Sequence, residues 1–313
     1  MSRKYLGRIL FFVILVTNIV LGSSSYSEDK KIIVKDFLQR EVTFAETPNR
    51  IVCLSPSLTE IFFSLGLGDK VVGVSVGSDF PPEVINLPKF NLYSRFEPKE
   101  NVIKDILSLQ PDIVLLWGTH QGSDVFRQTV DYFERENVKV LTFGTPKDIE
   151  EIFSQISLLG EVFNQRESAE KLIYDMREVI EQIKNKTKDL KEFQKPRVYI
   201  EIQKDPIITV GRNSYIQHII ELAGGKNIFE DKQKWPMVTP GEIVTKDPQV
   251  IIISKRETDR DEVLNRKGWQ EITAVKDGRV YVMGGGVIER HGPRIVEGLE
   301  ELARLLHPEL FAN

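Results

Sequence analysis

The chain has 313 residues, of which 41% are hydrophobic and 28% charged, and its formal net charge is −4. These fractions are close to the globular average and exclude the disordered and fibrous classes. The acidic balance gives no sign of a nucleic-acid partner. The length exceeds that of one ordinary core and predicts two lobes of ordinary domain size.

Residues 1–25 predict an export signal that is removed from the mature protein. Arg3, Lys4 and Arg8 precede an apolar run over 9–21, and small polar residues follow it. This order is typical of a secretory signal. The apolar run is short for a membrane span, although an uncleaved anchor is the alternative. Without these residues the chain carries a net charge of −7, three units more negative than the −4 of the whole chain.

One cysteine, Cys53, lies in the apolar run 51–54. It cannot form an internal disulfide, and its neighbours predict burial. Ser23 stands after the apolar core of the signal, where a lipid-modified cysteine would be. We therefore expect an exported periplasmic protein that is not lipid-anchored.

The predicted N-terminal lobe, residues 31–160, alternates strands and helices after a leading hairpin at 31–35 and 41–44. The next helix is predicted to open with a capping box formed by Ser57 and Glu60. Such alternation predicts an α/β fold with a parallel, doubly wound sheet. The predicted strands lie at 50–55, 71–74, 113–117 and 139–143, and the predicted helices at 57–66, 99–110 and 124–136.

Residues 161–195 are predicted to link the two lobes by helix, within a stretch without strands that runs from about Asp148 to Lys195. Apolar residues repeat at helical spacing from Ala169 to Ile183, and Pro196 ends the segment. The pattern predicts one long amphipathic helix, or two helices joined near Asn164.

The predicted C-terminal lobe, residues 196–313, restarts the α/β alternation. Segments 106–117 and 243–254 share the order of helix end, proline and apolar strand, so the two lobes are predicted to be similar. Ligands of open α/β sheets bind beyond the carboxyl ends of the strands. Two facing units therefore predict a binding cleft between the lobes. The strands are expected at 197–202, 250–254 and 279–283, and the helices at 213–223 and 293–306.

Several aromatic residues fall in predicted loops or at the ends of predicted elements, where a cleft would be lined. Flat amphipathic rings suit a large planar or hydrophobic chelate, although ordinary loop packing is the alternative for each ring. The planar guanidinium of Arg290 could reach acceptors at the edge of such a ligand. The aromatic residues are Tyr93, Phe96, Trp117, Tyr215 and Trp235.

Two patterns raise other functions. Residues 73–77 match the G-x-S-x-G pattern, so an exported serine hydrolase with Ser75 as nucleophile is an alternative. Pro81 and Pro82 oppose the helix that this chemistry requires after the serine. No two of the four histidines have the spacing of metal ligands, and we predict no catalytic residue, no cofactor and no direct metal site. A protein that binds a metal ion directly, with ligands from distant loops, is a further alternative.

Short segments spread along the chain carry a resemblance to a known family. They are 50–60 (RIVCLSPSLTE), 72–74 (VGV), 78–82 (SDFPP), 109–114 (LQPDIV), 235–239 (WPMVT), 247–251 (DPQVI) and 292–294 (GPR). Together they resemble the iron-siderophore and cobalamin periplasmic substrate-binding proteins of ABC importers, most closely the cobalamin-binding members. The resemblance implies a class III periplasmic binding protein, with two α/β lobes joined by one long helix.

The resemblance also implies a ligand and partners. Tyr93, Trp117, Trp235 and Arg290 match positions that line the corrinoid cleft of the family. Gly77 stands where another aromatic residue of that cleft would align, so a ferric siderophore or haem remains an alternative ligand. The implied protein is a monomer that captures the chelate without chemistry and delivers it to an ABC permease in the inner membrane.

Members of the family present one glutamate from each lobe to the permease. The matching positions here are Lys104 and Gly241. Glu100, or else Asp105, lies near the first position and Glu242 lies beside the second. We expect Glu100 and Glu242 to dock the permease.

Overall fold

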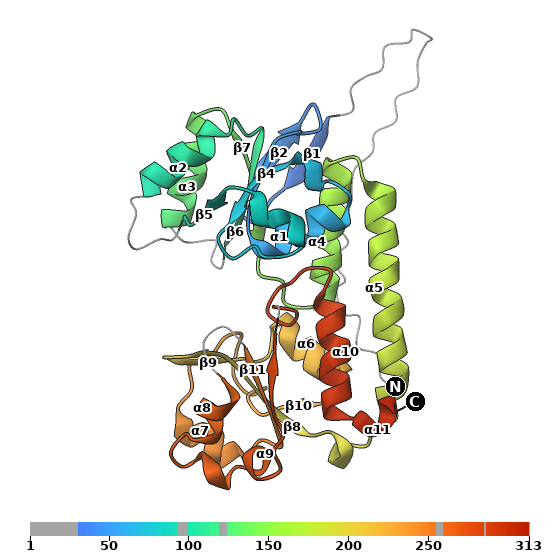
Figure 1. Cartoon of the computed structure of the whole chain (residues 1–313). Coiled ribbons are helices and arrows are strands. Elements are labelled where there is room, and N and C mark those ends of the chain that lie inside the picture. The colour runs from blue at the N-terminus through green and yellow to red at the C-terminus, as the bar shows by residue number, and fades with distance from the viewer. Residues whose placement is uncertain (1–30, 93–98, 119–123, 255–258, 285, 313) are drawn as a thin grey trace, which may run out of the picture. The chain divides into compact units, whose positions relative to one another are not determined.

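The computed structural model describes residues 31–92, 99–118, 124–254, 259–284 and 286–312. Residues 31–313 form one compact unit, whose elements are labelled in Figure 1. The predicted signal, residues 1–25, lies outside the described residues. Within the described part of the chain, no helix combines the length and the apolar character that a membrane span needs.

The N-terminal half, here residues 31–162, contains the predicted hairpin and a parallel sheet. Strand β1 (Ile32–Lys35) pairs antiparallel with β2 (Glu41–Phe44). The five-stranded sheet has the order β5-β4-β3-β6-β7, with every pair parallel. Strand order reverses between β3 and β6, which makes this point the place where such sheets bind ligands. The strands are β3 (Ile51–Leu54), β4 (Val71–Ser75), β5 (Lys89–Phe90), β6 (Ile113–Gly118) and β7 (Lys139–Gly144).

The predicted helices α1, α2 and α3 are present, with an error at the start of α1, whereas the short segments η1 and η2 were not predicted. This helix begins at Pro56 after the N-cap residue Ser55, so the predicted capping box of Ser57 and Glu60 is wrong. Proline suits the first helical position because its missing N–H would have no partner there. The side chain of Glu60 is left to bond elsewhere. The helical segments are α1 (Pro56–Ser64), η1 (Gly68–Lys70), η2 (Pro82–Asn86), α2 (Lys99–Ser108), α3 (Asp124–Arg135) and α4 (Ile149–Val162).

Helix α5 (Arg166–Thr187) follows α4 after a break at Asn164, which adopts the left-handed conformation with φ 54°. The alternative of two helices is therefore confirmed. Helix α5 packs against α4, and also against α6 (Tyr215–Leu222) and α10 (Ile295–Leu306) of the C-terminal half, here residues 196–312. It therefore connects the two halves by packing as well as by sequence (Figure 1).

The C-terminal half contains a second sheet of order β10-β8-β11-β12, in which all pairs are parallel. The prediction missed β9, which turns back antiparallel on β8, and the two-residue strands β5 and β10. Strand order reverses between β8 and β11. The strands are β8 (Arg197–Lys204), β9 (Ile207–Thr209), β10 (Lys226–Asn227), β11 (Val250–Ser254) and β12 (Val280–Met283). The remaining helical segments are η3 (Glu192–Gln194), α7 (Pro240–Lys246), α8 (Arg260–Leu264), η4 (Trp269–Glu271), α9 (Thr273–Lys276) and α11 (Pro308–Phe311).

One apolar cluster runs through both halves. It includes Phe62 of α1, Phe163 after α4, Met176 of α5 and Leu299 of α10. Phe62 and Phe163 meet edge to face, with ring centroids 4.7 Å apart. Burying each such side chain contributes about 1.5–3 kcal/mol. Cys53 also lies in this cluster, where burial raises the pKa of its thiol and keeps it protonated.

Candidate functional site

Trp117 is the next-to-last residue of β6, beside the reversal of strand order in the N-terminal sheet. Its side chain is half-buried, and its ring lies 5.8 Å from the ring of His291. His291 belongs to the loop between β12 and α10 of the C-terminal half. The carboxyl end of one sheet is therefore in contact with a loop that follows the other.

Tyr215 extends this contact toward Trp235. The centroid of the Tyr215 ring lies 5.9 Å from that of His291 and 5.9 Å from that of Trp235, both edge to face. Trp117, His291, Tyr215 and Trp235 thus form a continuous series of contacts, here called the ring row. The spacings fall within the range in which aromatic pairs attract each other. The structure therefore brings the predicted Trp117, Tyr215 and Trp235 together.

The start of α6 fixes the position of Tyr215. The side chain of the N-cap residue Ser214 accepts a hydrogen bond from the backbone N–H of Gln217, which satisfies a free donor of the first turn. The hydroxyl of Tyr215 donates to the carbonyl of Glu289 over 2.5 Å. The buried ring is consequently held at both ends.

Backbone pairing holds the loop that carries Trp235. The N–H of Gly211 donates to the carbonyl of Lys234, and the N–H of Lys234 donates to Arg212, each over 2.7 Å. A side chain at Gly211 would place its Cβ only 2.6 Å from the carbonyl oxygen of Lys232, so glycine permits this close approach. These hydrogen bonds attach the loop of Trp235 to the segment that follows β9, and the side chain of Trp235 is half-buried there.

His291 is a site residue that sequence reasoning missed. Only 5% of it is exposed, and burial lowers the pKa of its imidazole to about 4 despite a hydrogen bond with its own backbone. The ring is therefore neutral at pH 7. The one available signal was its position next to the Gly292-Pro293-Arg294 segment of the resemblance.

The guanidinium of Arg290 is directed at the N-terminal half. Its Nη1 lies 2.8 Å from Oε1 of Glu60 and 2.6 Å from Oδ1 of Asp79. Its Nη2 donates to the carbonyl of Gly77 over 3.0 Å. Burial alone would lower the pKa of Arg290, but the bonds with Asp79 and Glu60 outweigh it and raise this pKa. Both terminal nitrogens of the predicted ligand-binding arginine are engaged within the protein.

Arg294 binds the same carboxylate from α10's N-terminus. Its Nη2 lies 2.9 Å from Oε1 of Glu60, and its Nε donates to Oε2 over 3.1 Å. The side chain of Glu60 is only 1% exposed. Glu60, Asp79, Arg290 and Arg294, here called the ion cluster, therefore join the two halves beside the ring row. Such pairing offsets the cost of burying the charges of Glu60, Arg290 and Arg294.

Two other predicted ligand residues, Tyr93 and Phe96, lie outside the described residues. Of the predicted docking residues, Glu100 is exposed in the first turn of α2. Glu242 opens α7 in a capping box with Thr239, which the prediction did not foresee. Hydrogen bonds from Lys232 and Thr239 lower the pKa of Glu242 to about 2, so it is ionised at neutral pH.

The hydroxyl of Ser75 bonds with another hydroxyl, that of Ser78, over 3.0 Å. Ser78 in turn bonds with Thr59 over 3.1 Å. A serine nucleophile needs a base such as histidine in this position. Among the described residues, no group of histidine, cysteine and carboxylate side chains could hold a metal ion.

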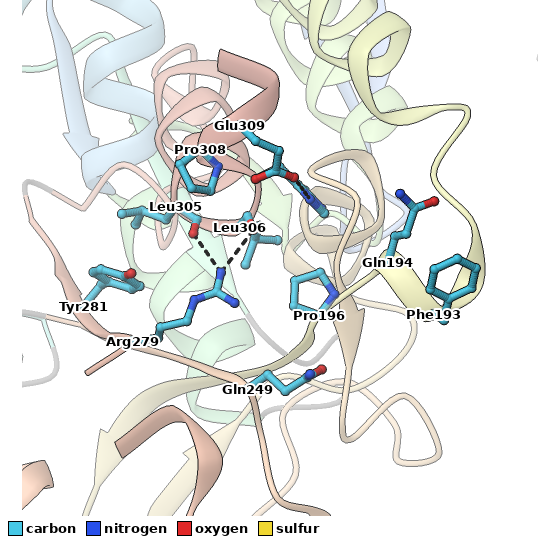
Figure 2. Close-up of a pocket in the computed structure, with 11 residues that line it drawn as sticks. Phe193, Gln194, Pro196, Gln249, Arg279, Tyr281, Leu305, Leu306, Pro308 and Glu309 are labelled. Carbon is cyan, nitrogen blue, oxygen red and sulfur yellow. Dashed lines mark hydrogen bonds and ion pairs between the residues drawn. The ribbon is translucent and has the colours of Figure 1, made fainter. Parts of the chain in front are cut away.

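A pocket of about 460 Å³, shown in Figure 2, lies at the amino ends of β8, β11 and β12. Trp117 and His291 instead stand at or after the carboxyl ends of strands. Arg279 of the pocket donates from Nη2 to the carbonyls of Leu305 and Leu306, over 3.1 and 3.0 Å. A basic side chain at the last carbonyls of a helix stabilises the helix end. The guanidinium of Arg279 thus serves to cap the C-terminal end of α10.

The comparisons with known proteins agree with this geometry. The model of the periplasmic binding protein family matches residues 51–285. The uncharacterized ABC transporter substrate-binding lipoprotein YvrC of Bacillus subtilis is 33% identical over 281 residues, which cover 89% of this chain and 86% of YvrC. The vitamin B12-binding protein of Vibrio cholerae is 27% identical over 265 residues, which cover 82% of this chain and 88% of that protein.

Among solved structures, the periplasmic heme-binding protein RhuT from Roseiflexus sp. RS-1 superposes with a TM-score of 0.72 at 22% identity. The match covers 84% of this chain and 99% of RhuT. It confirms the predicted fold class of two α/β lobes joined by a long helix. The chain belongs to the periplasmic binding protein family and is a substrate-binding protein of ABC importers.

Proposed function

We propose that the protein captures a corrinoid against the ring row and delivers it to an ABC permease without altering it. The observation that carries the proposal is the contact series from Trp117 to Trp235, since it draws aromatic side chains from both halves. Planar apolar surface on both sides is what a large macrocyclic chelate requires. Tyr93, which the resemblance assigns to the same cleft, completes the proposed ligand-binding set.

Cobalamin is the proposed ligand because a relative that spans most of this chain is named for binding vitamin B12. Haem and ferric siderophores are the alternative ligands. In the proposal Arg290 acts at the edge of the site, next to His291 in the sequence, where its bonds to Glu60, Asp79 and Gly77 hold the halves together. Preorganised halves avoid part of the ordering cost of binding.

The proposal places the protein outside the inner membrane, exported by residues 1–25 and acting as a monomer. Glu100 and Glu242 are the proposed contacts with the permease. Mass spectrometry of the mature N-terminus tests the export step, and a free amine beginning near Tyr26 is expected. An acyl group or an uncleaved N-terminus would contradict this part of the proposal.

A thermal-shift screen of the purified protein tests the ligand. Cyanocobalamin, haemin, a ferric trihydroxamate and a ferric tricatecholate are added in turn. A ligand that binds only the folded state raises the melting temperature, by an amount that corresponds to about 2.7 kcal/mol at 100 times Kd. We expect cyanocobalamin to give the largest shift. A shift with haemin or a siderophore alone selects an alternative ligand, and no shift with any chelate contradicts the proposal.

A further inference from the structure

Asp79 follows β4 at its carboxyl end and meets an arginine from the other half of the chain. Its Oδ1 lies 2.6 Å from Nη1 of Arg290. The two partners differ in exposure: the side chain of Asp79 is 67% exposed, whereas that of Arg290 is 5% exposed. Asp79 is therefore the member of the ion cluster that lies at the solvent boundary.

A ligand from solvent cannot readily replace the other two partners of Arg290. Glu60 is buried and also binds Arg294, and the carbonyl of Gly77 belongs to the backbone. Of these three partners of Arg290, Asp79 is therefore the one that a carboxylate arriving from solvent can replace. Such an exchange trades one ion pair for another and gains little energy, because the charge of the guanidinium is already neutralised.

We infer that Asp79 determines the charge selectivity of the chelate site: it pairs with Nη1 of Arg290 at the solvent boundary and so favours chelates without anionic groups over anionic ones. The inference rests on the proposed function, since it concerns the ligand of the same site. It makes Asp79 a specificity-determining residue. The uncharged amide periphery of a corrinoid fits this arrangement, whereas haem carries two carboxylates and a ferric tricatecholate carries three negative charges.

Substitution of Asp79→Asn tests the inference, because asparagine keeps the shape of aspartate and removes its charge. The matched control is Asp69→Asn. Asp69 is also exposed and lies in η1, just before β4, whereas Asp79 lies after β4. The control therefore changes the net charge by the same amount at the other end of this strand. Calorimetry measures Kd for a ferric trihydroxamate, which is uncharged, and for a ferric tricatecholate.

We expect Asp79→Asn to shift the ratio of the two affinities toward the anionic chelate by on the order of tenfold at low salt, and less at high salt. Asp69→Asn should leave the ratio within about twofold. An unchanged ratio in Asp79→Asn, or an equal shift in both variants, overturns the inference while chelate binding itself still supports the proposed function.

A second measurement does not depend on chelate binding. Citrate, a small tricarboxylate, is titrated into the wild type and both variants while the melting temperature is followed. Without the charge of Asp79, Arg290 should bind citrate more strongly, so the melting temperature of Asp79→Asn should rise more steeply with citrate than that of the wild type or Asp69→Asn. Three equal responses overturn the inference even if no chelate binds, which would separately overturn the proposed function.

Discussion

The imidazole of His291 lies 5.8 Å from the ring of Trp117, with an angle of 35° between their planes. This contact joins a loop of the C-terminal half to the end of β6 in the N-terminal half. It places a buried, neutral imidazole in the middle of the ring row. The first prediction concerns the titration of this residue.

Burial lowers the pKa of His291 from its ordinary value of 6.5 to about 4 in the folded protein. The free energy of unfolding should therefore fall as the pH drops from about 6.5 to about 4. In this window the unfolded chain binds a proton that the folded protein excludes, so stability rises with pH. Between pH 7.5 and pH 5 the contribution is about 2 kcal/mol.

Urea unfolding of the wild type and of His291→Phe at both pH values measures this contribution. The variant should lose that part of the pH dependence, while the contributions of all other groups remain. Identical pH dependence in the two proteins would show that His291 is not the group responsible.

Replacement of Trp235 by alanine should weaken chelate binding by about 1–3 kcal/mol, since it removes the ring that ends the ring row. Fluorescence titration or calorimetry with the chelate selected by the thermal screen gives the change in Kd. Phe193→Ala is the control, because Phe193 is 89% exposed and lines the pocket at the opposite sheet edge. Equal affinities of Trp235→Ala and the wild type would remove Trp235 from the site.

Neutralising Glu60 should destabilise the protein by roughly 3–5 kcal/mol, because two arginines would lose their buried counter-ion. The change Glu60→Gln keeps the size of the side chain. Asp175→Asn, which breaks the exposed Lys171–Asp175 pair, should cost less than about 1 kcal/mol. Denaturant unfolding compares the variants, and a cost for Glu60→Gln no larger than that for Asp175→Asn would contradict the assigned role of the ion cluster.

The hydrolase alternative predicts turnover that depends on Ser75. We expect no hydrolysis of p-nitrophenyl esters above the rate of the buffer, because the Ser75 hydroxyl bonds with Ser78. Ser75→Ala should match the wild type in this assay and in chelate binding. Ester hydrolysis that Ser75→Ala abolishes would establish an enzyme.

Reversal of both docking charges, Glu100→Lys with Glu242→Lys, should abolish chelate uptake by cells while the purified variant still binds the chelate. The control is Glu170→Lys with Glu178→Lys, two exposed residues of α5 with the same change of charge. Uptake at the wild-type rate in the docking variant would reject Glu100 and Glu242 as permease contacts.

Local signals predicted most of the fold. Continuous apolar runs such as 113–117 predicted buried parallel strands, and the spacing from Ala169 to Ile183 predicted the long helix. Strand β9 was missed because three residues are too short for a periodic signal, and its pairing with β8 depends on a loop between them. The start of α1 was misplaced because Ser55 and Ser57 are both favoured N-cap residues, and only the course of the chain decides between them.

The sequence by itself determined the two α/β units, the helix between them and the family, because periodicity, turn residues and motifs are properties of short segments. It also marked Trp117 and Trp235 as candidates. Only the tertiary structure decided that His291 and Tyr215 connect them, and that Arg290 binds Glu60. The physical reason is that these partners lie far apart in the chain. The Trp117–His291 and Glu60–Arg290 contacts exist only once the two halves pack together, and the contacts of Tyr215 only once three separate segments of the C-terminal half meet. No local pattern encodes that packing.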